Sequence, residues 1–106
     1  MRARPHINIR PAATADVDDS ASFISGRNFV AGIRFLAAFD QALATLADFP
    51  EIGTPYPLPN PALEGLRFWS LPRFENWVVF YVVRGDTIEV LRVLHSARDI
   101  PSILEE

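Results

Sequence analysis

Hydrophobic residues fill two stretches near the C-terminal end of the chain, and a two-residue gap separates them. Residues 76–84 (NWVVFYVVR) and residues 87–95 (TIEVLRVLH) are both rich in β-branched and aromatic residues, which favour strands. Gly85 and Asp86 lie between the two stretches, and glycine adopts a positive φ at no steric cost. The pattern therefore predicts a β-hairpin with a two-residue loop, and the remaining elements are organised around it.

The loop also predicts which residues pair across the hairpin: Arg84 with Thr87, Tyr81 with Val90 and Trp77 with Leu94. Side chains alternate between the two faces of a strand. One face is then predicted to carry Trp77, Val79, Tyr81, Val83, Ile88, Val90, Arg92 and Leu94, and the other Val78, Phe80, Val82, Leu91, Val93 and His95. Both faces are apolar, unlike a sheet with one face in water. We therefore expect the chain's own helices on one face and, as a hypothesis, another polypeptide chain on the other.

The hydrophobic spacing before the hairpin predicts a strand followed by two helices. Residues 6–10 alternate as in a short strand, and residues 12–25 place apolar side chains three and four apart, as in a helix that stops at Gly26. A second helix is predicted to start at the cap Asn28 and to run to Asp48. Its core-facing stripe is predicted to comprise Phe29, Ile33, Leu36, Phe39, Leu43 and Leu46.

Proline interrupts regular structure between residues 49 and 61, where five prolines disfavour both helix and central strand. Residues 66–71 then resume as a strand, residues 73–76 turn into the hairpin, and residues 100–106 are expected to add a short helical turn. The element order β-α-α-β-β-β predicts one α+β domain over residues 1–106. It is a two-layer design, with an N-terminal strand and an antiparallel two-helix hairpin packed on an antiparallel sheet.

Composition narrows the range of functions. The chain has no cysteine and only two histidines, His6 and His95, which are too isolated to indicate a metal site, and nothing indicates a cofactor. No apolar run approaches the roughly 18 residues of a membrane span, and no secretory signal opens the chain, so we expect a cytoplasmic protein with no membrane partner. Its net charge of −3, with all ten basic residues arginine, argues against direct, sequence-specific nucleic-acid binding.

Four segments resemble the RelE/ParE superfamily of toxins, and within it the ParE-like branch. Residues 49–53 (FPEIG) resemble the Pro-x-x-Gly turn of the family, and residues 65–67 (GLR) resemble the Leu-Arg that opens its second strand. Residues 78–83 (VVFYVV), followed by residues 90–99 (VLRVLHSARD), are similar to its C-terminal signature. The resemblance covers nearly the whole chain from Ile7 onwards.

The resemblance implies a toxin of a type II toxin–antitoxin system, a class linked to stress responses, that a cognate ParD-like antitoxin neutralises in a hetero-oligomer. ParE-like members are associated with inhibition of DNA gyrase through protein binding, and this is the function we expect. RelE-like members instead cut messenger RNA on the ribosome. A non-toxic binding module with the same fold is the third alternative.

Cleavage of RNA requires groups that accept and donate a proton, and positive charge near the phosphate. His95, Arg67 and Arg98 are the candidates for these roles in the strand region. The face that carries Val78 and Phe80 has no basic groups where a nuclease of this family needs them. We therefore expect no catalytic residues and a protein that is not an enzyme, with the three candidates kept for the ribonuclease alternative.

Other residues are expected to bind the antitoxin or to stabilise the fold. Aromatic and arginine side chains dominate the energetics of interfaces, and the predicted antitoxin-binding residues are Trp69, Phe74, Trp77, Phe80 and Arg84. The predicted structural residues are Arg92, in an internal ion pair, and Arg98 with Asp99, as a pair that fastens the C-terminal turn.

Two further contacts are expected from the positions of the side chains. His95, at the end of a strand, is expected to hydrogen-bond to the backbone. Arg67 is expected to pair with a carboxylate such as Glu64 or Glu75.

Overall fold

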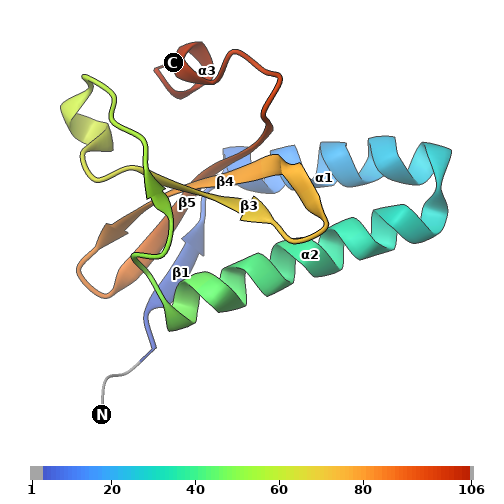
Figure 1. The fold of residues 1–106 in the computed structure, drawn as a ribbon, viewed down its shortest axis with the longest axis horizontal. Helices are drawn as coiled ribbons and strands as arrows, with labels where there is room; N and C mark the ends of the chain where they lie inside the picture. The colour runs from blue at the N-terminus through green and yellow to red at the C-terminus, as the bar shows by residue number, and fades with distance from the viewer. Residues whose placement is uncertain (1–3, 106) are drawn as a thin grey trace.

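The computed structural model describes residues 4–105, which form two layers, with α1 and α2 side by side against one face of a sheet (Figure 1). The elements are β1 (His6–Ile9), α1 (Pro11–Arg27), α2 (Phe29–Asp48), β2 (Thr54–Pro55), the 3-10 helix η1 (Pro61–Leu63), β3 (Arg67–Leu71), β4 (Phe74–Arg84), β5 (Thr87–His95) and α3 (Ile100–Leu104). The α+β fold class is confirmed. The predicted helical turn at the C-terminus is confirmed as α3, and Glu106 lies outside the described residues.

The sheet has five strands in the order β1-β5-β4-β3-β2. Strand β1 runs parallel to β5, whereas the other neighbours are antiparallel. The sheet is therefore mixed, which corrects the prediction of a purely antiparallel sheet. The physical reason is that α1 leads the chain away from β1 and α2 brings it back, so β3 runs in the same direction as β1. Two antiparallel hairpins then give β5 this direction as well, and β1 pairs with it in parallel. The two-residue strand β2, which contains Pro55, pairs only at the opposite edge, where a missing N–H is tolerated.

Asn28 joins the two helices and caps both of them. Its extended backbone (φ −154°, ψ 107°) ends α1, and its amide donates to the carbonyl of Ile24. Its side-chain oxygen accepts a hydrogen bond from the amide of Ala31 at 3.0 Å, which confirms the predicted cap of α2. Gly26 does not stop α1 as predicted, because the helix continues to Arg27 and ends only where Asn28 becomes extended.

The buried face of α2 differs from the predicted stripe. Phe39 and Leu46 are buried as predicted, and Leu43 is partly buried against the core. The other three predicted members are exposed: Phe29 at 70%, Ile33 at 53% and Leu36 at 42%. Small residues are the reason, because the helix turns Gly32, Ala38 and Ala42 towards α1 and the sheet and buries Phe35 beside them.

Helix α2 is also long and apolar enough to cross a membrane by length and composition alone, which is weak evidence. One face of it lies in the domain core, and the core helix of a soluble protein passes the same test.

A β-bulge interrupts the main hairpin. From the loop to the pair Tyr81–Val90 the register is the predicted one. The register then shifts between Phe80 and Tyr81, so that Phe80 lies opposite Arg92 and Leu91 is the extra residue on β5. A bulge adds one residue to one strand, and it therefore reverses the facing of every residue beyond it.

Because of the bulge, the prediction of which β5 side chains share a face is wrong beyond Leu91. Trp77 pairs with His95, not with Leu94. Val93 packs in the core on the helix side, and Leu94 packs on the opposite side, the reverse of the prediction. Alternation alone cannot reveal this exchange, because both faces of the strand are apolar.

The second face of the sheet is covered by the chain itself. Its core residues Val78, Phe80, Val82, Leu91 and Leu94 are at most 7% exposed. Leu63 of η1 and Leu66 just before β3 cover them, together with Ile100 and Leu104 from α3, which lies with η1 across the sheet from the long helices (Figure 1). The hypothesis that another chain covers this face is therefore wrong. Both sides of the hairpin are enclosed by one polypeptide, so the open-face argument for a partner is lost.

Candidate protein-binding surface

The turn that follows α2 is fixed from inside the domain. The Tyr81 hydroxyl accepts a hydrogen bond from the amide of Gly53 at 2.8 Å and donates one to the carbonyl of Pro50 at 2.9 Å. The Arg67 guanidinium donates to the carbonyl of Glu51 at 3.1 Å and to that of Gly53 at 2.7 Å. Side chains of β4 and β3 thus satisfy the carbonyls of Pro50, Glu51 and Gly53 and the amide of Gly53.

Burial raises the pKa of Tyr81 above its ordinary value, although the hydrogen bond from Gly53 and the charge of Arg67 act in the opposite direction. The phenol therefore stays neutral, as it must in order to donate one hydrogen bond while it accepts another. Gly53 is required for space: a Cβ built there would lie 2.5 Å from the Tyr81 Oη and 2.9 Å from the carbonyl oxygen of Phe68.

The predicted pairing of Arg67 with Glu64 or Glu75 is wrong, because its guanidinium is directed at two backbone carbonyls. The resemblance of residues 49–53 and 65–67 to family motifs thus has a common physical cause. The two segments form one unit in which arginine and tyrosine hold a glycine turn.

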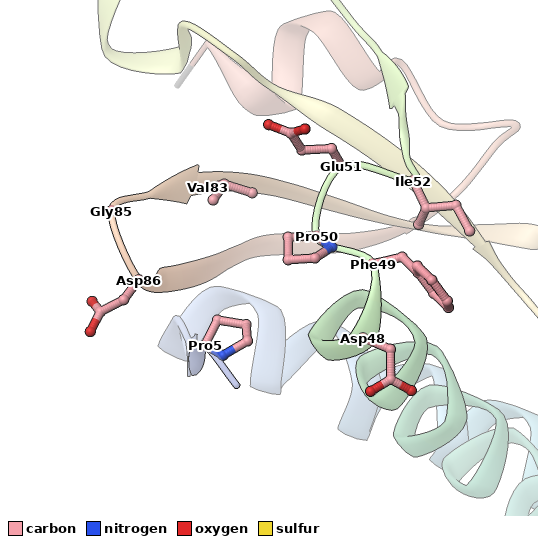
Figure 2. A pocket seen from close by; sticks show the side chains of 9 residues that line it. All are labelled: Pro5, Asp48, Phe49, Pro50, Glu51, Ile52, Val83, Gly85 and Asp86. Atoms are coloured by element: carbon pink, nitrogen blue, oxygen red, sulfur yellow. The ribbon is translucent and has the colours of Figure 1, made fainter. Parts of the chain in front are cut away.

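A groove of about 820 Å³ lies between this turn, the start of β1 and the tip of the main hairpin. It is lined by Pro5, Asp48, Phe49, Pro50, Glu51, Ile52, Val83, Gly85 and Asp86 (Figure 2). Its apolar side chains include Phe49, which is 63% exposed, and Ile52, which is 40% exposed. Figure 2 shows Pro50 at the centre, with the carboxylates of Asp48, Glu51 and Asp86 around it. The groove therefore combines an apolar floor with an acidic rim.

A second apolar surface lies where α1 meets α2. We call it the helical patch, and it consists of Phe29, Val30, Ile33 and Leu36 in the first half of α2, each at least 42% exposed. Phe23 on α1 is also exposed, at 61%, and the Arg27 guanidinium carbon lies 4.9 Å from the centre of its ring. Large apolar side chains gathered on one surface indicate an interaction site.

The predicted antitoxin-binding aromatic residues lie elsewhere. Trp69, Phe74 and Trp77 are partly buried against the core on the helix side. Phe80 is 1% exposed, so contact with a partner would require the covering segments to move. Arg84 is exposed, and it donates to the carbonyl of Ala62 at 2.7 Å. Their role in antitoxin binding stays a prediction.

Sequence reasoning missed both exposed apolar surfaces. For the helical patch, a signal was available in the sequence: α2 carries large apolar residues on more than one face, since Val30 and Ile33 lie beside the residues that face the core.

The three candidate catalytic residues are not brought together. His95 and Arg98 line a small cleft of about 110 Å³ that also contains Asp16 and Asp19, whereas Arg67 is engaged at the Pro50–Gly53 turn. Carboxylates in the cleft repel a phosphate. The geometry therefore does not assemble the charges that cleavage of RNA needs.

His95 has a structural environment. Its Nδ1 accepts a hydrogen bond from the amide of Ala97 at 3.0 Å, which confirms the expected backbone contact. Its ring meets that of Trp77 edge to face, with the centroids 4.7 Å apart. Within residues 4–105, no three His, Asp or Glu side chains are grouped so that they could hold a metal ion.

The internal ion pair expected for Arg92 is present. Its Nε and Nη2 donate to the two carboxylate oxygens of Asp16 on α1, at 2.7 and 2.8 Å. The Asp16 carboxylate also accepts the amide of Val93 at 3.0 Å. The pair therefore joins the first helix to β5.

Arg98 and Asp99 hold the C-terminal turn separately. The Arg98 amide donates to the carbonyl of His95 at 3.0 Å, and the Asp99 carboxylate accepts the Ser102 hydroxyl at 2.7 Å. These bonds do not join the two residues to each other, so their predicted role as a structural pair stays a prediction.

Comparison with known proteins places this fold in a family. The family model described as "ParE toxin of type II toxin-antitoxin system, parDE" matches residues 7–100. A solved chain titled "Chromosomal ParDE TA system from P. aeruginosa" superimposes with a TM-score of 0.70 at 18% identity, covering 87% of this chain and 96% of that one, which shows a shared fold. Among curated proteins, none matches the chain significantly. Because the family model spans nearly the whole domain, the chain belongs to the ParE toxin family of type II toxin–antitoxin systems.

Proposed function

We propose that this protein inhibits DNA gyrase in the cytoplasm by binding it, and that a ParD-like antitoxin neutralises it by covering the helical patch. The family membership carries the proposal. It is supported by the combination of two exposed apolar surfaces with the lack of an assembled proton-transfer site among residues 4–105.

The helical patch has the spacing that suits a partner helix. Phe29, Ile33 and Leu36 stand at positions i, i+4 and i+7 of α2 and are exposed by 42% or more. An amphipathic helix recognises such a row by laying its own apolar face along it. The solved chain of similar fold comes from a ParDE system, which supports a ParD-like partner for this one.

The ribonuclease alternative is less well supported, because catalysis needs an acid, a base and positive charge converging on one phosphate. The Arg67 guanidinium already donates to two carbonyls. His95 and Arg98 share their cleft with two carboxylates. A function through binding requires none of these residues to react.

Gyrase inhibition is tested with purified toxin, gyrase and plasmid DNA. We expect the toxin to stop supercoiling and to accumulate gyrase–DNA cleavage complexes, and we expect His95→Ala to retain this effect. Full supercoiling activity at excess toxin would overturn the proposal. Cleavage of ribosome-bound message that His95→Ala abolishes would establish the ribonuclease instead, and harmless expression without any antitoxin would establish a non-toxic module.

Antitoxin binding is tested at the helical patch. Ile33→Arg places a charge in the exposed apolar row, and we expect it to weaken antitoxin binding about tenfold or more, as for a central interface residue. Ala15→Arg adds the same side chain at an exposed position of α1, away from the surface of α2, and it should leave affinity unchanged. Equal affinities for the two variants, measured by calorimetry, would remove the helical patch from the interface.

A further inference from the structure

We infer that the groove beside the Pro50–Gly53 turn is a preformed site for a segment of the antitoxin that carries an apolar side chain flanked by arginine or lysine. The inference rests on the proposed function in one respect, namely that an antitoxin holds this chain. It adds a second contact region, and the chemistry of the segment that binds there.

The groove is preformed because its wall cannot relax easily. Four hydrogen bonds between the turn and the side chains of Tyr81 and Arg67 fix the backbone of the turn, at 2.7 to 3.1 Å. The same turn leaves Phe49 and Ile52 exposed at 63% and 40%. A rigid surface that presents apolar groups binds a partner without the entropic cost of ordering itself.

The rim indicates the charge of the occupant. Asp48, Glu51 and Asp86 stand around the apolar floor (Figure 2). Arg4 already places its guanidinium 3.3 Å from the Asp48 carboxylate, although both side chains are more than half exposed, so this pair contributes little stability. The rim is thus able to receive a guanidinium. A second copy of this chain fits poorly, because each copy has a net charge of −3.

The two apolar surfaces lie along one helix. The helical patch occupies the first half of α2, and the groove begins at Asp48, where α2 ends. The helix has 20 residues and is therefore about 30 Å long. Between the two surfaces, the exposed residues of α2 include Ala37, Asp40 and Ala44, whose short side chains leave room for a partner chain along the helix. A single antitoxin that lies along α2 therefore reaches both surfaces, which is why we assign the groove to it.

Synthetic peptides test the chemistry on the full-length chain. The probes are three heptapeptides that alternate leucine with arginine, with glutamine or with glutamate, and binding is followed by NMR on the ¹⁵N-labelled protein. We expect the arginine peptide to shift the amides of Glu51, Ile52 and Asp86 and to bind about tenfold more tightly than the glutamate peptide. Equal affinities, no binding, or shifts confined to other surfaces would overturn the proposal.

Paired variants then connect the binding to the rim. Glu51→Gln with Asp86→Asn keeps the shape of the rim and removes two charges, so it should abolish the preference for the arginine peptide. Asp18→Asn removes an exposed charge on α1 and should preserve that preference. An unchanged preference in the rim variant would overturn the assignment. So would shifts of the same amides on concentration of the protein alone, because they would show that a second copy occupies the groove.

The outcome is independent of gyrase. A chain that does not inhibit gyrase can still prefer the arginine peptide, and a chain that inhibits gyrase can lack the preference. Failure of the groove assignment is therefore distinguished from failure of the proposed function.

Discussion

The Tyr81 hydroxyl on β4 and the Gly53 amide after α2 are joined by a hydrogen bond of 2.8 Å, although 28 residues separate them in the chain. The phenol of Tyr81 lies in the core, and the residue that packs against its hydroxyl must be glycine, since no Cβ fits at Gly53. Arg67 completes the unit from the neighbouring strand. One buried polar cluster thus sets how the chain leaves its longest helix and enters the edge of the sheet.

Tyr81→Phe should destabilise the domain by about 1–3 kcal/mol, because it leaves the amide of Gly53 and the carbonyl of Pro50 without their partner. Urea unfolding measures this change. Hydrogen exchange of the Gly53 amide should accelerate at the same time. Tyr56→Phe is the matched control, since the Tyr56 ring packs against Phe68 and Phe80 and residues 4–105 show no hydrogen bond from its hydroxyl. Equal losses in the two variants would show that the hydroxyl of Tyr81 is not what holds the turn.

Gly53→Ala should also destabilise the domain, by about 1–3 kcal/mol, through overpacking. The new methyl group would lie 2.7 Å from the Tyr81 Cε1 and 2.9 Å from the carbonyl oxygen of Phe68, and the backbone oxygen has little freedom to move. Gly26→Ala provides the opposite case. No atom lies within 4 Å of its Cβ position, so alanine inside α1 should stabilise the domain by about 0.5–1 kcal/mol. Thermal unfolding of both variants checks the contrast, and a stabilised Gly53→Ala would contradict the steric account.

Local patterns predicted the elements of this fold well. The hairpin loop, the Asn28 cap and the strand that ends before Pro72 all follow from residues that act on their immediate neighbours. The internal ion pair of Arg92 was also predictable, because a guanidinium on an apolar strand requires an acid. The identity of that acid, Asp16, was not predictable, since 76 residues separate the two.

Features that depend on tertiary packing were not predicted. The β-bulge beside Phe80 adds one residue to a strand that is apolar on both faces, so the hydrophobic pattern does not reveal it. Leu63 and Leu104 close the second face of the sheet from segments too short to show a period. The exposed row on α2 was assigned to the core because Gly32 and Ala38, which make the close contacts, count for little in an apolar pattern. The helical patch was missed for this reason.

Acid should destabilise the domain through Glu89. Burial raises the pKa of Glu89, but the hydrogen bond from Asn8 and the charges of Arg10 and Arg84 outweigh it and hold the pKa below its ordinary value of 4.5. At a pH near 4.5, the folded state therefore binds fewer protons than the unfolded state. The stabilisation is present above pH 4.5 and is lost as the pH falls through the lower folded value.

Urea unfolding between pH 6 and pH 3, about the range over which carboxylates titrate, tests this prediction. Glu89→Gln should reduce the decrease in the free energy of unfolding over this range. Asn8→Ala should reduce it in part, because it removes the hydrogen bond and keeps both arginines. The same pH dependence in Glu89→Gln as in the unmodified chain would show that another group causes the loss of stability.

Asp16→Ala should be among the most destabilising changes on α1. The side chains of Arg92 and Asp16 are only 25% and 14% exposed, so the charge left behind on Arg92 is poorly solvated. Removal of one partner from a buried pair costs about 3–5 kcal/mol, and the partial exposure here favours about 3 kcal/mol. The amide of Val93 loses its acceptor as well.

Asp18→Ala is the matched control, because it makes the same change on an exposed position of the same helix and should alter stability by less than about 0.5 kcal/mol. Asp16→Leu combined with Arg92→Met replaces both charges with apolar groups. The combination should restore most of the lost stability, since burial of the pair costs the solvation of both ions. If Asp16→Ala behaves like Asp18→Ala in urea unfolding, the ion pair is not what fastens α1 to β5, and the other contacts of α1, which include its buried Ala13, Val17 and Ala21, hold the helix on the sheet.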